Sequence, residues 1–112
     1  LARQAGLEIG ASGGLVVNEF LQTSDPNIYA AGDMIEVEHL VSGRRARVPL
    51  AGPANRQGRT AASNAMGVAM PYGGALGTSV VKIFGATAGM TGLSERAARA
   101  AASLATSMSI AR

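Results

Sequence analysis

The sequence predicts a chain of mixed α and β structure, divided into two parts by a glycine-rich connection. Three observations support this prediction. Short apolar runs of strand length alternate with turns in the first 50 residues, and an alanine-rich stretch of helical length follows at about residues 53–66. Residues 67–77 are rich in glycine and contain a proline, a composition typical of a linker between two structured parts. A branched, alternating run and a second alanine-rich stretch then complete the chain.

The first part is predicted to begin with the end of a helix. Residues 1–7 carry apolar side chains at helical spacing up to a glycine that stops the helix. After a flexible turn, residues 15–17 are predicted to form a short strand. Residues 24–27 form a turn, because proline fixes its own φ while Asp and Asn bond to nearby backbone amides. The apolar run at 28–31 is therefore interpreted as the next strand.

A hairpin is predicted after the second strand. Residues 37–41 and 46–50 alternate apolar and polar side chains on either side of Ser42-Gly43-Arg44. The three arginines at residues 44, 45 and 47 lie at or beside the tip of this hairpin. They are interpreted as a solvated turn.

The stretch from Pro53 to Met66 is predicted to be a helix. Pro53 suits a first turn, where its missing N–H would have had no partner, and Gly67 ends the helix. On its own, the stretch is interpreted as an alanine-rich packing helix. Five small residues are expected to allow close packing against a neighbouring element: Ala54, Gly58, Ala61, Ala62 and Ala65.

The last third is predicted to contain a strand, a loop and a helix. Residues 78–84 alternate and are rich in branched side chains, and residues 85–92 are expected to form a loop. Ser94 is a suitable N-cap for a helix from Glu95 to about Ser103. Residues 104–112 are a candidate for the next strand.

Composition excludes several classes of function. Although the net charge is +3, the arginines are scattered and only 4% of the residues are aromatic, so no nucleic-acid surface is expected. The absence of cysteine excludes disulfides, thiolate metal sites and a cysteine nucleophile within these residues. His39 is the only histidine, and no metal site is predicted. No spanning apolar run and no leader are present, so a cytoplasmic protein without membrane contact is expected.

Residues 23–33, TSDPNIYAAGD, are the most informative stretch. Spacing alone allows two interpretations of the final Gly32-Asp33: an aspartate that caps the next element, or a carboxylate placed to bind a cofactor hydroxyl. The full string resembles the second FAD-binding motif of the pyridine nucleotide-disulfide oxidoreductases, T-x-x-x-x-I-Y-A-x-G-D. This resemblance implies that Gly32 and Asp33 contact FAD and that Asp33 binds a ribityl hydroxyl.

Residues 49–59, PLAGPANRQGR, carry a second resemblance. The string is similar to one in coenzyme A-disulfide reductases, NADH oxidases, NADH peroxidases and polysulfide reductases. The resemblance implies that Pro53, Ala54 and Asn55 lie against the flavin, with backbone donors more important than side chains. Unpaired amides in the first turn would stabilise the negative charge of a reduced flavin. The two arginines of the string would serve a subunit interface or a substrate anion, and both interpretations stay open.

The resemblance also implies a domain organisation. Residues 1–68 correspond to the end of an FAD-binding Rossmann-like domain, residues 69–77 to a linker, and residues 78–112 to the first part of an α+β dimerisation domain. The family's Gly-x-Gly-x-x-Gly fingerprints and redox cysteine are absent here. The chain is therefore interpreted as a C-terminal fragment that is inactive alone, and no catalytic residue is assigned within it.

For the whole parent enzyme, the resemblance implies a homodimer that uses FAD and NAD(P)H. Electrons would pass through a cysteine-based centre to a small-molecule disulfide, a persulfide, peroxide or oxygen. The alternative from another class is a non-catalytic dimerisation or interaction module, favoured by the small-residue helix, an exposed sheet edge and the lack of reactive groups. Flavin binding distinguishes the two, since such a module would not bind FAD.

Overall fold

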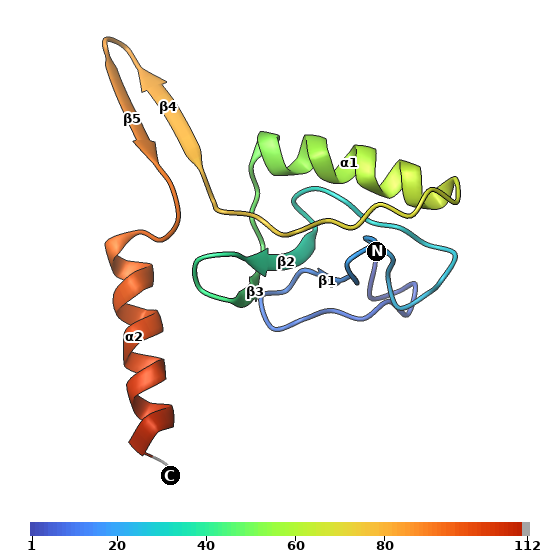
Figure 1. Cartoon of the computed structure of the whole chain (residues 1–112), viewed down its shortest axis with the longest axis horizontal. Helices are drawn as coiled ribbons and strands as arrows, with labels where there is room; N and C mark the ends of the chain where they lie inside the picture. The colour runs from blue at the N-terminus through green and yellow to red at the C-terminus, as the bar shows by residue number, and fades with distance from the viewer. Residues whose placement is uncertain (111–112) are drawn as a thin grey trace.

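The computed structural model describes the backbone of residues 1–110 and the side chains of residues 1–102. A three-stranded sheet has the order β1-β2-β3, with β1 parallel and β3 antiparallel to β2. In Figure 1, α1 lies beside this sheet, while the β4–β5 hairpin and α2 extend away from it. The elements are β1 (Leu15–Val16), β2 (Ile35–His39), β3 (Arg44–Ala46), α1 (Ala51–Ala65), β4 (Ser79–Ile83), β5 (Ala86–Met90) and α2 (Glu95–Ile110).

The chain starts with a helical capping turn. Gly6 has φ +76°, and its N–H donates to the carbonyl of Arg3 at 3.1 Å. The N–H of Leu7 donates to the carbonyl of Ala2 at 3.1 Å. This pair of bonds is the Schellman arrangement that closes a helix C-terminus on a left-handed glycine. The predicted helix end is therefore present as a cap, although residues 1–7 form turns and no regular helix.

The prediction of a strand at residues 28–31 was wrong. These residues bond back to the segment just before the 24–27 turn, with Thr23 N–H donating to Ile28 O at 2.9 Å and Ala30 N–H to Leu21 O at 3.0 Å. Only an isolated bridge results. The strand that pairs with β1 is β2, which begins after Gly32-Asp33. The apolar run correctly indicated extended backbone. Because of the 24–27 turn, however, residues 28–31 form their hydrogen bonds with the nearby residues 21–23 and not with another strand of the sheet.

The hairpin predicted from residues 37–41 and 46–50 is present, but both strands begin two residues earlier and the second is only three residues long. Val37 faces Ala46 and His39 faces Arg44. The interpretation of these arginines as a solvated turn was wrong for two of them. Arg45 Nη2 donates to the carbonyls of Val17 at 2.7 Å and Glu36 at 2.6 Å, and Arg47 Nε donates to the carbonyl of Asp33 at 3.0 Å. The Arg45 guanidinium thereby joins the chain after β1 to β2.

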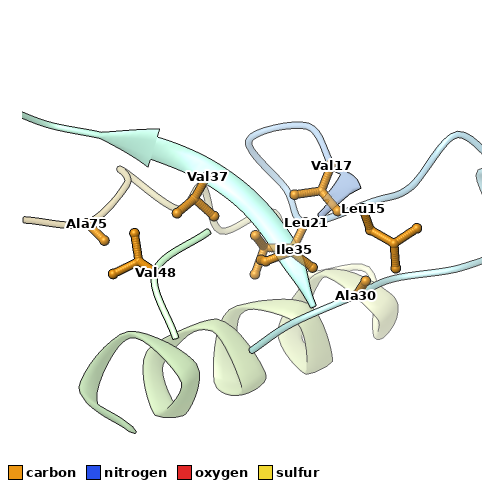
Figure 2. Close-up of a cluster of buried hydrophobic side chains, with 8 residues drawn as sticks. All are labelled: Leu15, Val17, Leu21, Ala30, Ile35, Val37, Val48 and Ala75. Atoms are coloured by element: carbon orange, nitrogen blue, oxygen red, sulfur yellow. The ribbon is translucent and has the colours of Figure 1, made fainter. Parts of the chain in front are cut away.

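A single apolar cluster lies along β2, as Figure 2 shows. The residues expected to form a linker contribute to it, because Ala75 is 1% exposed and exchanges two 2.9 Å bonds with the β2 edge: its N–H donates to Glu38 O and its carbonyl accepts Leu40 N–H. The segment 69–77 is thus joined to the edge of β2 at Ala75. The buried members of the cluster are Leu15, Val17, Leu21, Ala30, Ile35, Val37, Val48 and Ala75.

Helix α1 begins two residues earlier than predicted, ends at Ala65, and is closed by the predicted glycine. Gly67 has φ +83° and donates to Asn64 O at 3.0 Å, while Val68 N–H donates to Ser63 O at 2.9 Å, a second Schellman cap. The expectation of a small-residue contact face was largely wrong, because only two of the five small residues are half-buried and the others are exposed. The buried face has the helical spacing Pro53, Gln57, Thr60 and Asn64.

Replacing Gly58 by alanine is expected to stabilise the chain. Gly58 is exposed within α1, and a Cβ added there would meet no atom within 4 Å. Alanine in a helix interior is favoured over glycine by about 0.5–1 kcal/mol, because alanine loses less backbone conformational entropy than glycine when the chain folds. Urea denaturation of the Gly58→Ala variant measures this gain, and a loss of stability would contradict the exposed position of Gly58.

The last part of the chain differs from the predictions in two places. Residues 86–90, expected to be loop, form β5 and pair with β4 across a turn in which Phe84 has φ +52°. Residues 104–110, a candidate strand, continue α2, because no glycine or proline interrupts them. The predicted cap is confirmed: Ser94 Oγ accepts Ala97 N–H at 3.3 Å. Residues 111–112 lie outside the described part.

Candidate functional site

The two informative stretches of the sequence meet at Gly32. The N–H of Gly32 donates to Gln57 Oε1 on α1 at 2.8 Å, and a Cβ added to Gly32 would lie 3.9 Å from the Cβ of Ala54. Gly32 has φ +84°, a conformation that costs a residue with a side chain about 1–2 kcal/mol. The end of the 23–33 stretch is therefore folded against the first turns of α1.

The Asp33 side chain is exposed immediately beyond this contact. Its main-chain carbonyl accepts a bond from Arg47 Nε at 3.0 Å, which holds the backbone. No hydrogen bond reaches its carboxylate from any side chain in residues 1–102 or from the backbone of residues 1–110. The carboxylate is thus free to accept hydrogen bonds from a ligand hydroxyl.

The start of α1 carries positive electrostatic potential. Leu50 occupies the N-cap without a side-chain hydrogen bond, and the first turn contains no acidic residue. The partial positive charge of the first-turn amides is therefore not neutralised by the chain. Pro53 is buried, Ala54 is half-buried, and the exposed Asn55 accepts a 3.4 Å bond from Arg59.

A hollow of about 580 Å³ adjoins the same helix start. Its walls are Gly52, Pro53 and Arg56 of α1, together with Leu40 and residues 74–78. Neither Gly32 nor Asp33 lines it. Pro53 is therefore shared between the hollow and the helix start, whereas Ala54 contacts Gly32.

Sequence reasoning missed Gln57 as a site residue. Its side chain is 1% exposed, and its Nε2 donates to the Tyr72 hydroxyl at 3.2 Å while Oε1 accepts Gly32 N–H. The sequence could have indicated its burial, because Gln57 lies one turn after Pro53 on the same helix face. A buried amide at such a position needs hydrogen-bond partners, but the sequence does not say which.

Sequence reasoning also missed the role of Glu36, to which it assigned no function. Glu36 is 3% exposed in β2, and its Oε1 accepts bonds from the N–H and Oγ of Ser12 at 2.6 and 2.5 Å. The Ser12 side-chain hydrogen bond is the main cause that lowers the pKa of Glu36, and burial opposes it. Among the described side chains, no group of three or more His, Cys, Asp or Glu is arranged to hold a metal ion.

Glu36→Gln is expected to destabilise the chain at neutral pH by about 1–2 kcal/mol, because hydrogen bonds to a charged acceptor are lost. The pKa of Glu36 is lowered in the folded state, so its charge stabilises the fold above the ordinary value of 4.5. That stabilisation is lost as the pH falls through the lowered pKa. The difference between variant and wild type should therefore shrink below about pH 4.5 in urea unfolding series. A difference independent of pH would contradict this role.

Residues 1–68 match the family described as pyridine nucleotide-disulphide oxidoreductase. The chain belongs to this family. The resemblance stated from the two sequence motifs is thereby confirmed. No helix in residues 1–110 is long and apolar enough to cross a membrane.

Curated relatives agree with this family. The chain is 48% identical over 95 residues to the "NAD(P)H sulfur oxidoreductase (CoA-dependent)" of Pyrococcus abyssi, covering 85% of the chain and 21% of the relative. It is 42% identical over 93 residues to the "NADH oxidase" of Methanocaldococcus jannaschii, covering 83% of the chain and 20% of that relative. The chain thus spans about one fifth of the length of these relatives.

Solved structures share the fold. The NAD-dependent persulfide reductase from A. fulgidus aligns with a TM-score of 0.86 at 39% identity, over 91% of this chain and 19% of that one. The reduced CoADR-RHD of Bacillus anthracis aligns with a TM-score of 0.83 at 50% identity, over 89% of this chain and 18% of that one. The mixed α and β class predicted from the sequence is thereby confirmed.

Proposed function

We propose that this chain supplies one wall of the FAD site in an NAD(P)H-dependent flavoprotein oxidoreductase. The observation that carries the proposal is the contact of Gly32 with α1. This contact places Gly32, the residue before the free carboxylate of Asp33, against Ala54 and Gln57 in the first two turns of α1. Family membership supports the same assignment.

The residues present fit the cofactor chemically. Gly32 and Ala54 are small enough for a planar ring to approach the backbone, and Asp33 offers two acceptor oxygens for a ribityl hydroxyl. Pro53 and Asn55 complete the helix start that would face the flavin. When bound, FAD would accept a hydride from NAD(P)H and pass the electrons on.

The first turn of α1 contributes electrostatic stabilisation in this proposal. Its amide groups carry partial positive charge and are fixed by the helix, so they need no reorganisation when negative charge develops nearby. The chain places no carboxylate in this turn that would cancel the effect. Because α1 begins at Ala51, the donors of this turn are the amides of Ala51 and Gly52: Pro53 has no N–H, and the Ala54 N–H donates to the carbonyl of Leu50 at 3.0 Å. The proposed role of Pro53, Ala54 and Asn55 is therefore to pack their side chains against the flavin and exclude water.

The proposed acceptor is a small sulfur compound, a coenzyme A-linked disulfide or persulfide. This choice rests on the names of the relatives, several of which are CoA-dependent sulfur or persulfide reductases, with NADH oxidases beside them. These 112 residues contain no cysteine, so the redox thiol of the proposal belongs to other residues of the whole protein. A cytoplasmic homodimer, with domains divided at residues 68 and 77, is part of the same proposal.

The test uses the natural full-length protein that contains these residues. We expect it to purify with FAD and to oxidise NADH or NADPH when coenzyme A disulfide, a persulfide or oxygen is supplied. Spectrophotometry of the flavin and of nicotinamide oxidation measures both properties. A full-length protein that self-associates but neither binds FAD nor oxidises NAD(P)H would overturn the proposal in favour of an interaction module.

A further inference from the structure

The side-chain amide of Gln57 is enclosed between two parts of the fold. Its Oε1 accepts Gly32 N–H at 2.8 Å, and its Nε2 donates to the Tyr72 hydroxyl at 3.2 Å. With 1% exposure, it is among the most completely buried side chains. An amide in this position has no water to replace a lost partner, so both bonds are costly to break.

The partner on the far side is itself fixed. The main-chain N–H of Tyr72 donates to the carbonyl of Glu19 at 2.7 Å, and its ring packs against the apolar cluster. The Gly32 N–H can only donate, so it sets the orientation of the Gln57 amide with Oε1 directed to Gly32, and the Tyr72 hydroxyl accepts from Nε2 on the other side. A rotated amide would place an N–H group against the N–H of Gly32.

On the other side, one bond joins Gly32 to α1, while its carbonyl accepts the N–H of Ile35 at 3.3 Å. Among the described residues, Gly32 N–H to Gln57 Oε1 is the only hydrogen bond between residues 30–34 and α1. Asp33, whose carboxylate would bind the cofactor, is the next residue along this backbone. Arg47 and Leu15 bond to the carbonyls of Asp33 and Met34, and Gln57 supplies the direct link from this backbone to α1.

We propose that Gln57 is a positioning residue for the cofactor site, which it builds by fixing the Gly32-Asp33 backbone against α1. This inference rests on the proposed FAD site and adds to it a residue that does not touch the cofactor. Gln57 keeps the Asp33 carboxylate and the first-turn amides of α1 at a constant separation. A ligand that contacts both therefore binds a preorganised pair and does not have to order the Gly32 turn.

The chain offers a matched control in Asn64. Asn64 is also a buried amide on the same face of α1, 8% exposed, seven residues further along. Its Nδ2 donates to the carbonyls of Phe20 and Met70 at 2.9 and 2.8 Å, and its Oδ1 accepts Met70 N–H at 2.7 Å. It makes none of its bonds to the Gly32 turn. A purely structural role predicts equal effects at the two amides.

The experiment compares Gln57→Met, Gln57→Glu and Asn64→Met in the full-length protein. Gln57→Met keeps the shape but leaves Gly32 N–H without an acceptor, so we expect the dissociation constant for FAD to rise about tenfold. Gln57→Glu keeps an acceptor for Gly32 and accepts the Tyr72 hydroxyl, so its FAD affinity should stay within about threefold of wild type. Asn64→Met should destabilise the fold while leaving FAD affinity within the same threefold range.

A readout independent of the flavin accompanies the titration. Hydrogen exchange of the Gly32 amide in the apoprotein should accelerate in Gln57→Met and stay slow in Asn64→Met. If Gln57→Met does not fold, Tyr72→Phe replaces it, with a smaller rise in the FAD dissociation constant and in the Gly32 exchange rate.

Equal loss of FAD affinity at Gln57 and Asn64 would overturn the inference, as would wild-type affinity in Gln57→Met. A wild-type protein that binds no FAD at all would instead overturn the proposed function, so the two failures are distinguishable. Faster Gly32 exchange together with weaker FAD binding in Gln57→Met alone would support the positioning role.

Discussion

Asp33→Asn is expected to weaken FAD binding to the full-length protein by about one to two orders of magnitude. The exposed carboxylate is the one negatively charged acceptor that follows the Gly32 turn, and asparagine keeps its size while removing its charge. A hydrogen bond to a charged partner contributes about 1.5–3 kcal/mol, which corresponds to a tenfold to hundredfold change in affinity. Titration of the apoprotein with FAD, followed by flavin fluorescence, measures the change.

Asp25→Asn is the control for this prediction. Asp25 belongs to the same 23–33 stretch, but its Oδ1 accepts the N–H of Asn27 at 2.9 Å within the turn. Its loss should alter turn stability and leave FAD affinity unchanged. Equal weakening by the two substitutions would mean that the net charge of the stretch matters, and that Asp33 makes no particular contact.

Gly10→Ala is expected to lower the free energy of unfolding by about 2–4 kcal/mol. A Cβ at residue 10 would overlap the carboxylate of Glu36, which lies under the 10–14 turn and bonds to Ser12. Either the carboxylate leaves its hydrogen bonds or the turn moves, and overpacking and lost charged hydrogen bonds each cost about 1–3 kcal/mol. Urea denaturation of the variant measures the loss.

Two further variants make this second prediction specific. Gly73→Ala adds a methyl group where no atom lies within 4 Å, so it should change stability by less than about 0.5 kcal/mol. The cost of Gly10→Ala should also be smaller in a Glu36→Ala background, since the overlapping group is gone. An equal cost in both backgrounds would show that the Gly10 turn and Glu36 do not interact.

Sequence reasoning located the candidate site but not the contacts that build it. The motifs at residues 23–33 and 49–59 were assigned to one cofactor by resemblance, and the structure joins them through the bond from Gly32 to Gln57. The hydrogen bond that joins them is accepted by the Gln57 side chain, 25 residues away from Gly32. Such long-range partners leave no periodic signal in a sequence, so the amide looked like any polar residue of an alanine-rich helix.

The errors in secondary structure have a similar origin. Residues 28–31 have strand character, but the preceding turn pairs them with residues 21–23 and not with β1. The β5 strand contains Gly89 and small side chains, which are typical of loops, and it is recruited by pairing with β4. By contrast, both predicted glycine stops, at Gly6 and Gly67, are confirmed, because a Schellman cap depends on local backbone conformation.

The measurement that most directly tests the central claim is a crystal structure of the full-length protein with FAD. The account predicts that a carboxylate oxygen of Asp33 lies about 2.5–3.0 Å from a ribityl hydroxyl, with the flavin ring against the start of α1. Gln57 should still accept the N–H of Gly32 at the distance seen here, 2.8 Å. A flavin bound away from Asp33 and from Pro53 would contradict the account.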